Sequence, residues 1–197
     1  MRRREFIMLL GGAGTTWPLA AWAQQKPARL ALLGSGGAQS SAIFMDAVKE
    51  GLAENGLAEG RDYVLDVRWA EGEYGRFPAL AAEVMKQNPR VILATTIAAV
   101  RAAQHASATI PIVMTTINDP VGAGLVASLA RPGGNVTGFT NIGSDLAGKR
   151  LELLKETVPK ASRVAILWDP KGQGGAGHAR ETKVAAPALA VQLQPVE

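Results

Sequence analysis

The sequence predicts an α/β protein, built on a doubly wound parallel sheet with flanking helices. Two observations lead to this prediction. Short apolar or alternating runs typical of strands take turns along the chain with segments that have the apolar spacing of helices. Such an alternation places helices over both faces of a parallel sheet, with right-handed crossovers between its strands.

Each expected element follows from its local pattern. Strands are expected where apolar or β-branched residues cluster between turn signals, at residues 29–34, 63–69, 91–94, 111–115, 136–140 and 164–168, with the start of another at 193–196. Helices are expected where apolar residues recur every three or four positions, at residues 41–55, 77–87 and 146–158. A helix of small residues is expected after Thr95-Thr96, through about Ala106, and a short helix at 121–130. A last helix is interrupted by Pro187.

The first 23 residues have the composition of an export signal. Three arginines at 2–4 precede an apolar stretch, and a small-x-small pattern ending at Ala23 predicts cleavage before Gln24. The apolar stretch is shorter than the roughly 20 residues that a stable membrane anchor needs. Residues 3–7, Arg-Arg-Glu-Phe-Ile, resemble the twin-arginine signature. We therefore expect export to the periplasm, with the general secretory route or an uncut anchor as alternatives.

The remaining composition excludes several classes of function. Removing 23 of the 197 residues leaves 174, enough for one domain or for one domain and part of another. The signal carries three arginines and Glu5, so the net charge falls from +4 to +2. No basic stripe remains that would favour nucleic acid or an anionic membrane. The chain has no cysteine, which excludes thiol chemistry.

No cofactor or metal motif is complete, and we expect neither group. The Gly34-Ser35-Gly36-Gly37 loop follows the first strand, but Gln39 stands where a dinucleotide-binding loop needs its third glycine. Neither a phosphate-binding P-loop nor a nucleophile elbow is present. His105 and His178 lack partners at ligand spacing, so they predict no zinc site.

Polar side chains gather where the expected strands end, which is the edge where open parallel sheets bind ligands. Hydroxyl, amide and carboxylate groups there suit hydrogen bonding to a small polar molecule. The candidate ligand-binding residues are Ser35, Gly36, Thr95, Thr96, Asn118, Asp119, Asn141 and Asp145, and Asp169 follows the sixth strand. Helix caps and turns use the same residue types, and Asp119-Pro120 has the pattern of a helix start. Trp69 and Tyr74 follow the second strand, and we expect them to cover the sheet edge, with stacking on a ligand as the alternative.

Three stretches resemble one protein family. They are residues 68–83, which begin Arg-Trp-Ala-Glu-Gly; residues 119–138, which end Arg-Pro-Gly-Gly-Asn-Val-Thr-Gly; and residues 149–159, which end Val-Pro. The chain resembles the periplasmic solute-binding proteins of ABC transporters, in the group that includes tryptophan- and tyrosine-binding members. The match runs in order from Ala28 to about Trp168.

The resemblance implies a fold of the type I periplasmic binding proteins, with two α/β lobes, a hinge and a ligand in the cleft between the lobes. Residues 24–160 would form lobe one, and residues 161–197 the crossover and an incomplete lobe two. A truncated gene, a frameshift or a fragment would each produce that short second lobe. The resemblance further implies a monomer that delivers a small molecule to a transporter permease. For an amino-acid ligand, Asp119 or Asp145 would be the partner of the ammonium group.

Three other functions remain open from the sequence. An exported α/β enzyme would need a nucleophile–base pair or a cofactor loop at the strand ends. A two-lobed regulator would need a DNA-binding element before the first strand, where this chain has its signal. A remnant of a solute-binding protein would bind nothing.

Overall fold

The computed structural model describes residues 26–168 and 175–196. The expected export signal, with its cleavage site between Ala23 and Gln24, lies outside the described residues, as does Asp169.

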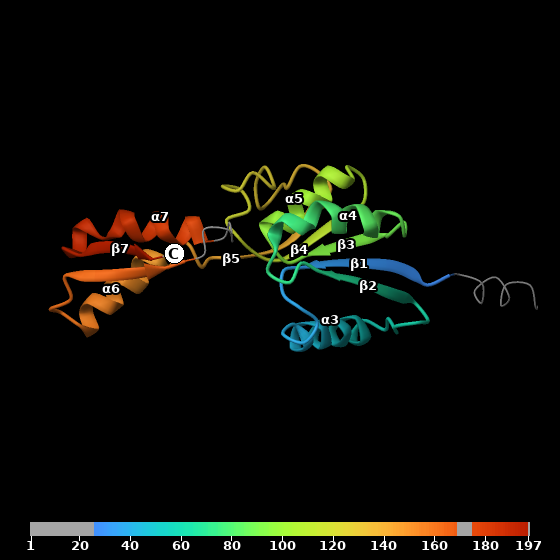
Figure 1. Ribbon diagram of the computed structural model, residues 1–197, viewed down its shortest axis with the longest axis horizontal. Coiled ribbons are helices and arrows are strands. Elements are labelled where there is room, and N and C mark those ends of the chain that lie inside the picture. The colour runs from blue at the N-terminus through green and yellow to red at the C-terminus, as the bar shows by residue number, and fades with distance from the viewer. Residues whose placement is uncertain (1–25, 169–174, 197) are drawn as a thin grey trace, which may run out of the picture.

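Five parallel strands form the larger sheet, in the order β2-β1-β3-β4-β5. Their bounds are β1 Ala28–Gly34, β2 Tyr63–Trp69, β3 Val91–Ala94, β4 Ile112–Asn118 and β5 Val136–Asn141. Helices α4 (Phe77–Met85) and α5 (Ile97–Ala106) cover one face, and α3 (Ala42–Glu54) lies on the other (Figure 1). The short 3₁₀ turn η1 (Tyr74–Arg76) leads into α4. The predicted α/β class with a parallel sheet is confirmed.

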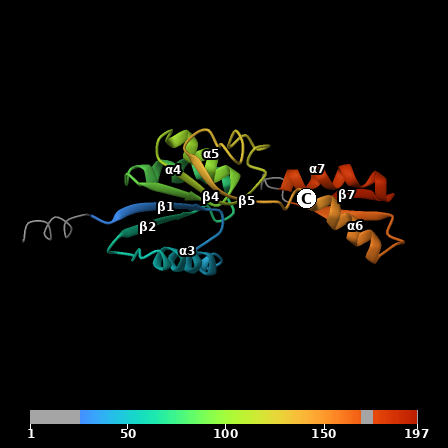
Figure 2. The ribbon, with the colours of Figure 1, turned by 180° about the vertical axis from the view of Figure 1, so that it is seen from behind.

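A second, smaller unit lies beyond β5 (Figure 2). Its parallel strands β6 (Arg163–Leu167) and β7 (Gln192–Val196) pair with each other, and α6 (Ala147–Thr157) and α7 (Gly175–Ala185) accompany them. The 3₁₀ turn η2 (Pro187–Leu189) interrupts the path from α7 to β7 at the predicted proline. Leu151 of α6 packs with Ala186 and Val191 in a small core of this unit. The predicted lobe boundary at residue 160 stays a prediction.

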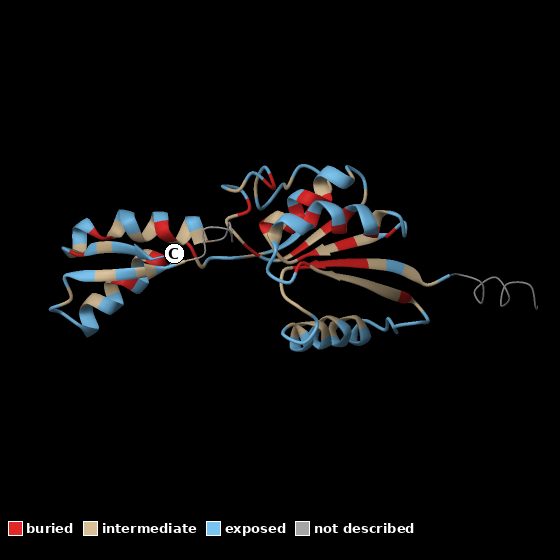
Figure 3. Cartoon of the chain, in the orientation of Figure 1, coloured by how far each residue is buried: buried red, intermediate tan, exposed pale blue. Residues whose placement is uncertain are grey.

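The main core lies between the sheet and the α4–α5 layer. Leu33 of β1, Phe77 of α4, and Ile92 and Ile112 of the central strands are fully buried there. The opposite helix contributes much less, because none of the residues of α3 is buried. Figure 3 shows this difference: red segments appear on α4 and α5 above the sheet, whereas α3 below it is only tan and pale blue. Burial of large apolar side chains is the main favourable term in folding, so the α4–α5 side holds the unit together.

Most elements lie within a few residues of their predicted bounds, but the helix predicted at 121–130 is wrong. The segment makes one helical turn, in which the Ala123 amide donates to the Asp119 carbonyl at 2.9 Å. Gly124 then has a φ of +69°, which ends the turn. The Ala127 amide instead donates to the Pro132 carbonyl at 2.9 Å, in a loop. The pattern of apolar residues did not reveal that Gly122 and Gly124 allow the chain to turn here instead of continuing as a helix.

The pairing of β4 with β5 is irregular. Their register shifts between Met114 and Ile117, which is typical of a bulge. Gly138 of β5 has a φ of +133°, and a Cβ there would overlap the backbone of Met114. A glycine is therefore required at this point of the strand.

Replacing Phe77 by alanine is expected to lower the free energy of unfolding by about 3–5 kcal/mol, because it removes a fully buried ring and leaves a cavity. Urea denaturation followed by circular dichroism measures the loss. Ile43→Ala is the control, since Ile43 is 87 % exposed on α3 and should change stability by no more than about 0.5 kcal/mol. Equal effects of the two changes would contradict the assignment of the core to the α4–α5 side.

Candidate functional site

The first predicted residues meet at the ends of β1 and β3. The Ser35 amide donates to Thr95 Oγ1 at 3.3 Å, and the Thr95 hydroxyl lies 3.4 Å from the Leu33 carbonyl. Both contacts follow from the parallel pairing, which places Leu33 beside Ala94 at the ends of the two strands. Thr95 thus ties the two strand ends together.

Thr96 and Gly36 have structural partners. Thr96 is the N-cap of α5, and its hydroxyl accepts a hydrogen bond from the Ala99 amide at 3.2 Å. The Gly36 carbonyl accepts from the Glu71 amide at 3.0 Å. A Cβ at Gly36 would lie 2.9 Å from Ser41 Oγ, so this loop is closely packed. These contacts match the capping and turn interpretation of the two residues.

The two aromatic residues after β2 cover the protein rather than a ligand space. A Cβ at Gly34 would overlap the Trp69 ring, which therefore lies against the end of β1. The Tyr74 ring packs on Phe77, with 6.2 Å between ring centroids. Both placements agree with the expectation that they cover the edge of the sheet.

Asn118 and Asn141 are neighbours in the register of β4 and β5. Asn141 Oδ1 accepts from the Gly143 amide at 3.0 Å, which shapes the start of the loop to α6. Asn118 Oδ1 is buried and has no hydrogen-bond partner among the described residues. A buried amide oxygen without a partner costs free energy, so Asn118 is the polar group here that most needs a donor.

Asp119 follows Asn118 in an unusual backbone conformation, with a φ of +45°. Aspartate, asparagine and glycine tolerate this left-handed region better than other residues. Asp119 Oδ1 accepts from the Gly122 amide at 2.8 Å, as a helix cap would. A Cβ at Gly122 would overlap the Asp119 carboxylate, so a glycine is needed opposite this turn.

A pocket of about 100 Å³ opens beside Asp119. It is lined by Asp119, Pro120, Val121, Leu129, Thr140, Asn141, Ile142, Ser144 and Asp145. Three predicted site residues thus line one pocket, namely Asp119, Asn141 and Asp145. Ser35, Gly36, Thr95, Thr96 and Asn118 do not line it. Two carboxylates beside apolar side chains suit a ligand that combines a cationic group with an apolar part.

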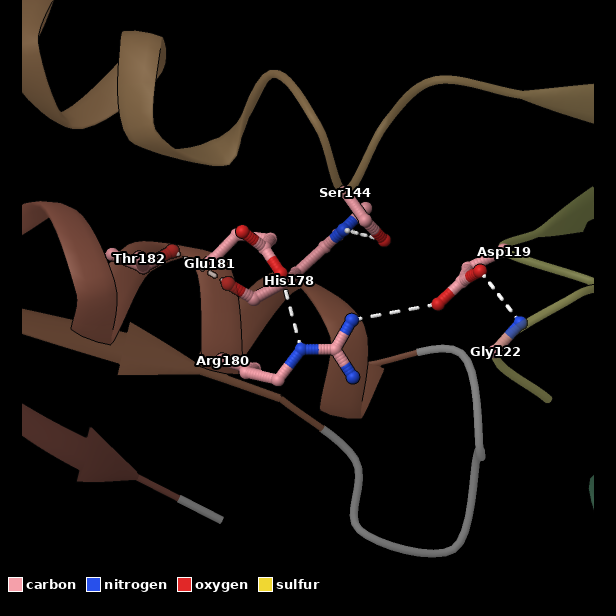
Figure 4. Close-up of polar contacts among 7 residues, drawn as sticks. All are labelled: Asp119, Gly122, Ser144, His178, Arg180, Glu181 and Thr182. Atoms are coloured by element: carbon pink, nitrogen blue, oxygen red, sulfur yellow. Dashed lines mark hydrogen bonds and ion pairs between the residues drawn. The ribbon is translucent and has the colours of Figure 1, made fainter.

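The second unit approaches this pocket through α7 (Figure 4). Arg180 Nη2 lies 3.4 Å from Asp119 Oδ2, and its Nε lies 3.0 Å from Glu181 Oε1. The hydrogen bond to Glu181, followed by the one to Asp119, raises the pKa of Arg180. Arg180 could not be predicted from the sequence, because no motif marks it and it lies 61 positions after Asp119.

His178 of α7 contacts the loop that follows β5. Its Nδ1 lies 3.3 Å from the hydroxyl of the buried Ser144. A Cβ at Gly177 would lie 2.8 Å from that same hydroxyl, and one at Gly143 would lie 2.9 Å from His178 Cε1. Two glycines therefore let α7 and the loop approach closely.

Within residues 26–168 and 175–196, no cluster of three or more potential metal-ligating side chains occurs. In the same ranges, no helix is long and apolar enough to cross a bilayer.

Comparison with known proteins identifies the family. The profile of the family described as ABC transporter substrate binding protein matches residues 38–197. The chain belongs to this family. A tyrosine-binding protein of Clostridioides difficile (strain R20291) is 33% identical over 129 residues, which are 64% of this chain and 37% of that protein.

Solved structures of similar proteins have the same fold. A conserved domain protein from Vibrio cholerae O1 biovar El Tor superimposes with a TM-score of 0.79 and 27% identity, over 87% of this chain and 57% of that one. An ABC domain from Streptococcus pneumoniae in complex with L-Trp has a TM-score of 0.77 and 23% identity, over 86% and 57% of the two chains. The chain thus spans little more than half the length of these structures, and 37% of the curated relative.

Replacing Thr96 by alanine is expected to lower the free energy of unfolding by about 0.5–2 kcal/mol, because α5 loses its N-cap hydrogen bond. Thr96→Ser keeps a hydroxyl and should retain most of that stability. Chemical denaturation of the three proteins measures the difference. If neither substitution lowered the free energy of unfolding, the N-cap hydrogen bond of Thr96 would not contribute to stability.

Proposed function

We propose that this protein is the periplasmic solute-binding component of an ABC-type uptake transporter, and that it binds a small polar molecule between two lobes. The observation that carries the proposal is the pocket at the ends of β4 and β5, which the second unit approaches through α7. Sites of this kind bind ligand by closing one unit on the other. Family membership supports the same role.

The chemistry of the pocket favours a ligand with an ammonium group. Asp119 and Asp145 supply negative charge, Asn141 supplies a neutral amide, and Val121, Leu129 and Ile142 add apolar surface. An amino acid with an apolar or aromatic side chain combines these features. The similar proteins named for tyrosine and solved with L-Trp make these two amino acids the first ligands to test.

We further propose that the protein is not an enzyme and needs no cofactor. The contact between Ser144 and His178 is the arrangement closest to a nucleophile and its base. Its hydroxyl is buried, and no carboxylate is hydrogen-bonded to His178 in the described part of the chain. Both features oppose a role for Ser144 as an exposed nucleophile.

The proposal includes the organisation inferred from the sequence. An export signal at residues 1–23 would deliver the protein to the periplasm, residues 24–160 would form lobe one, and residues 161–197 the crossover and part of lobe two. The packing of α6 on α7 supports a boundary closer to the end of β5. A monomer that presents its ligand to a permease completes the proposal, with no role for nucleic acid or for membrane insertion after cleavage.

Thermal unfolding of the purified protein tests ligand binding. We expect L-tyrosine or L-tryptophan to raise Tm by about 5 to 10 °C at concentrations roughly 100 times Kd, because a ligand that binds only the folded state stabilises it. The amines tyramine and tryptamine, which lack the carboxylate, belong in the same screen.

The affinity of the Asp119→Asn variant tests whether the ligand binds in the pocket beside Asp119. The variant keeps the hydrogen bond to the Gly122 amide and the left-handed backbone but removes the charge, so we expect Kd for an ammonium ligand to rise about tenfold or more. The matched control is Asp46→Asn on the exposed surface of α3. A normal Kd for Asp119→Asn would place the ligand elsewhere, and the absence of any Tm shift for the natural protein would favour the non-binding remnant.

A further inference from the structure

One ion pair joins the two units, and its carboxylate member, Asp119, lines the pocket. Arg180 Nη2 lies 3.4 Å from Asp119 Oδ2. Every other ion pair among the described residues joins two groups of the same unit. The contact is therefore a charged bridge between α7 and the turn after β4 (Figure 4).

The surroundings make this bridge easy to open. The side chain of Arg180 is 62% exposed and that of Asp119 is 36% exposed, so water screens their attraction. A distance of 3.4 Å is long for a charged hydrogen bond. Glu181 holds the other side of the guanidinium at 3.0 Å, so Arg180 keeps a carboxylate partner when it leaves Asp119.

The rest of the contact is steric and does not depend on charge. A Cβ added at Gly177 of α7 would collide with Ser144 Oγ, and a Cβ added at Gly143 would collide with both His178 Cε1 of α7 and Asn118 Oδ1 of β4. The approach of the two units is thus permitted by small residues. The Arg180–Asp119 pair supplies its electrostatic part.

We propose that the Arg180–Asp119 ion pair is a clasp that holds the two units together in the unliganded protein, and that a cationic ligand group must displace it. Arg180 is then a specificity-determining residue. It raises the cost of binding for a simple amine, and it offers its freed guanidinium to a ligand that also carries a carboxylate. The ligand part of this inference rests on the proposed function.

Distance measurements between spin labels test the clasp without any ligand. The chain has no cysteine, so Glu50→Cys on α3 and Val184→Cys on α7 provide two specific, exposed attachment sites. Arg180→Gln and Asp119→Asn should each lower the population of the short-distance form by about 1.5- to 5-fold, the range that exposed ion pairs produce. The double variant should equal either single one, because both remove the same interaction.

Two controls separate the clasp from a general effect of charge. Lys183→Gln removes a positive charge three positions further along α7 and should leave the distances unchanged. Arg180→Lys keeps the charge and should retain most of the short form. Distances that are the same in the natural protein, Arg180→Gln and Asp119→Asn would overturn the clasp.

Affinity measurements test the specificity. In Arg180→Gln, tyramine should bind about 1.5- to 5-fold more tightly, because it no longer competes for Asp119. The affinity ratio of L-tyrosine to tyramine should fall by at least the same factor. An unchanged ratio would overturn the role of Arg180 in specificity. A failure of every ligand to bind any variant would overturn the proposed function, whereas the label distances alone would still decide the clasp.

Discussion

The parallel alignment of β1 with both β2 and β3 is the constraint on which the candidate site depends. It places Gly34 beside Trp69 on one side and Leu33 beside Ala94 on the other, so that the chain leaves all three strands at one edge. β4 and β5 extend the same alignment to Asn118 and Asn141. The pocket exists because polar residues that are distant in sequence emerge together there. The stability of the larger unit, which carries the pocket, comes from the buried apolar layer between the sheet and helices α4 and α5.

The polar residues at that edge of the sheet fall into two groups with different contacts. Around β1 and β3, the polar groups bind the protein itself, as Thr95 does between two strands and Thr96 does at the start of α5. Around β4 and β5, the carboxylates of Asp119 and Asp145 line the pocket, and Asp119 also pairs with Arg180 of the second unit. In the larger unit, the polar groups at the ends of β1 and β3 hold the strands and α5 in place, whereas those at the ends of β4 and β5 contact the second unit.

The features that could be predicted from the sequence are those that a local pattern of residues determines. The strands follow from apolar runs, and the edge of the sheet from their parallel order, so Asp119, Asn141 and Asp145 could be assigned to one region. Local pattern does not encode contacts across the fold. The close approach of α7 depends on Gly177 and Gly143, whose role appears only when the two segments are placed side by side. The contact of Arg180 with Asp119 could not be predicted for the same reason. The prediction of a helix at 121–130 was wrong because Gly124, with its positive φ, turns the chain there.

The irregular pairing of β5 has a consequence for how such proteins diversify. β5 leads directly into the loop and helix of the second unit, and the bulge opposite Gly138 increases the twist of the strands just before that exit. The backbone geometry at Gly138, two residues before Thr140 in the lining of the pocket, therefore affects the direction in which β5 leads into the second unit. A change at this irregularity would alter the direction of β5 without changing any side chain that lines the pocket.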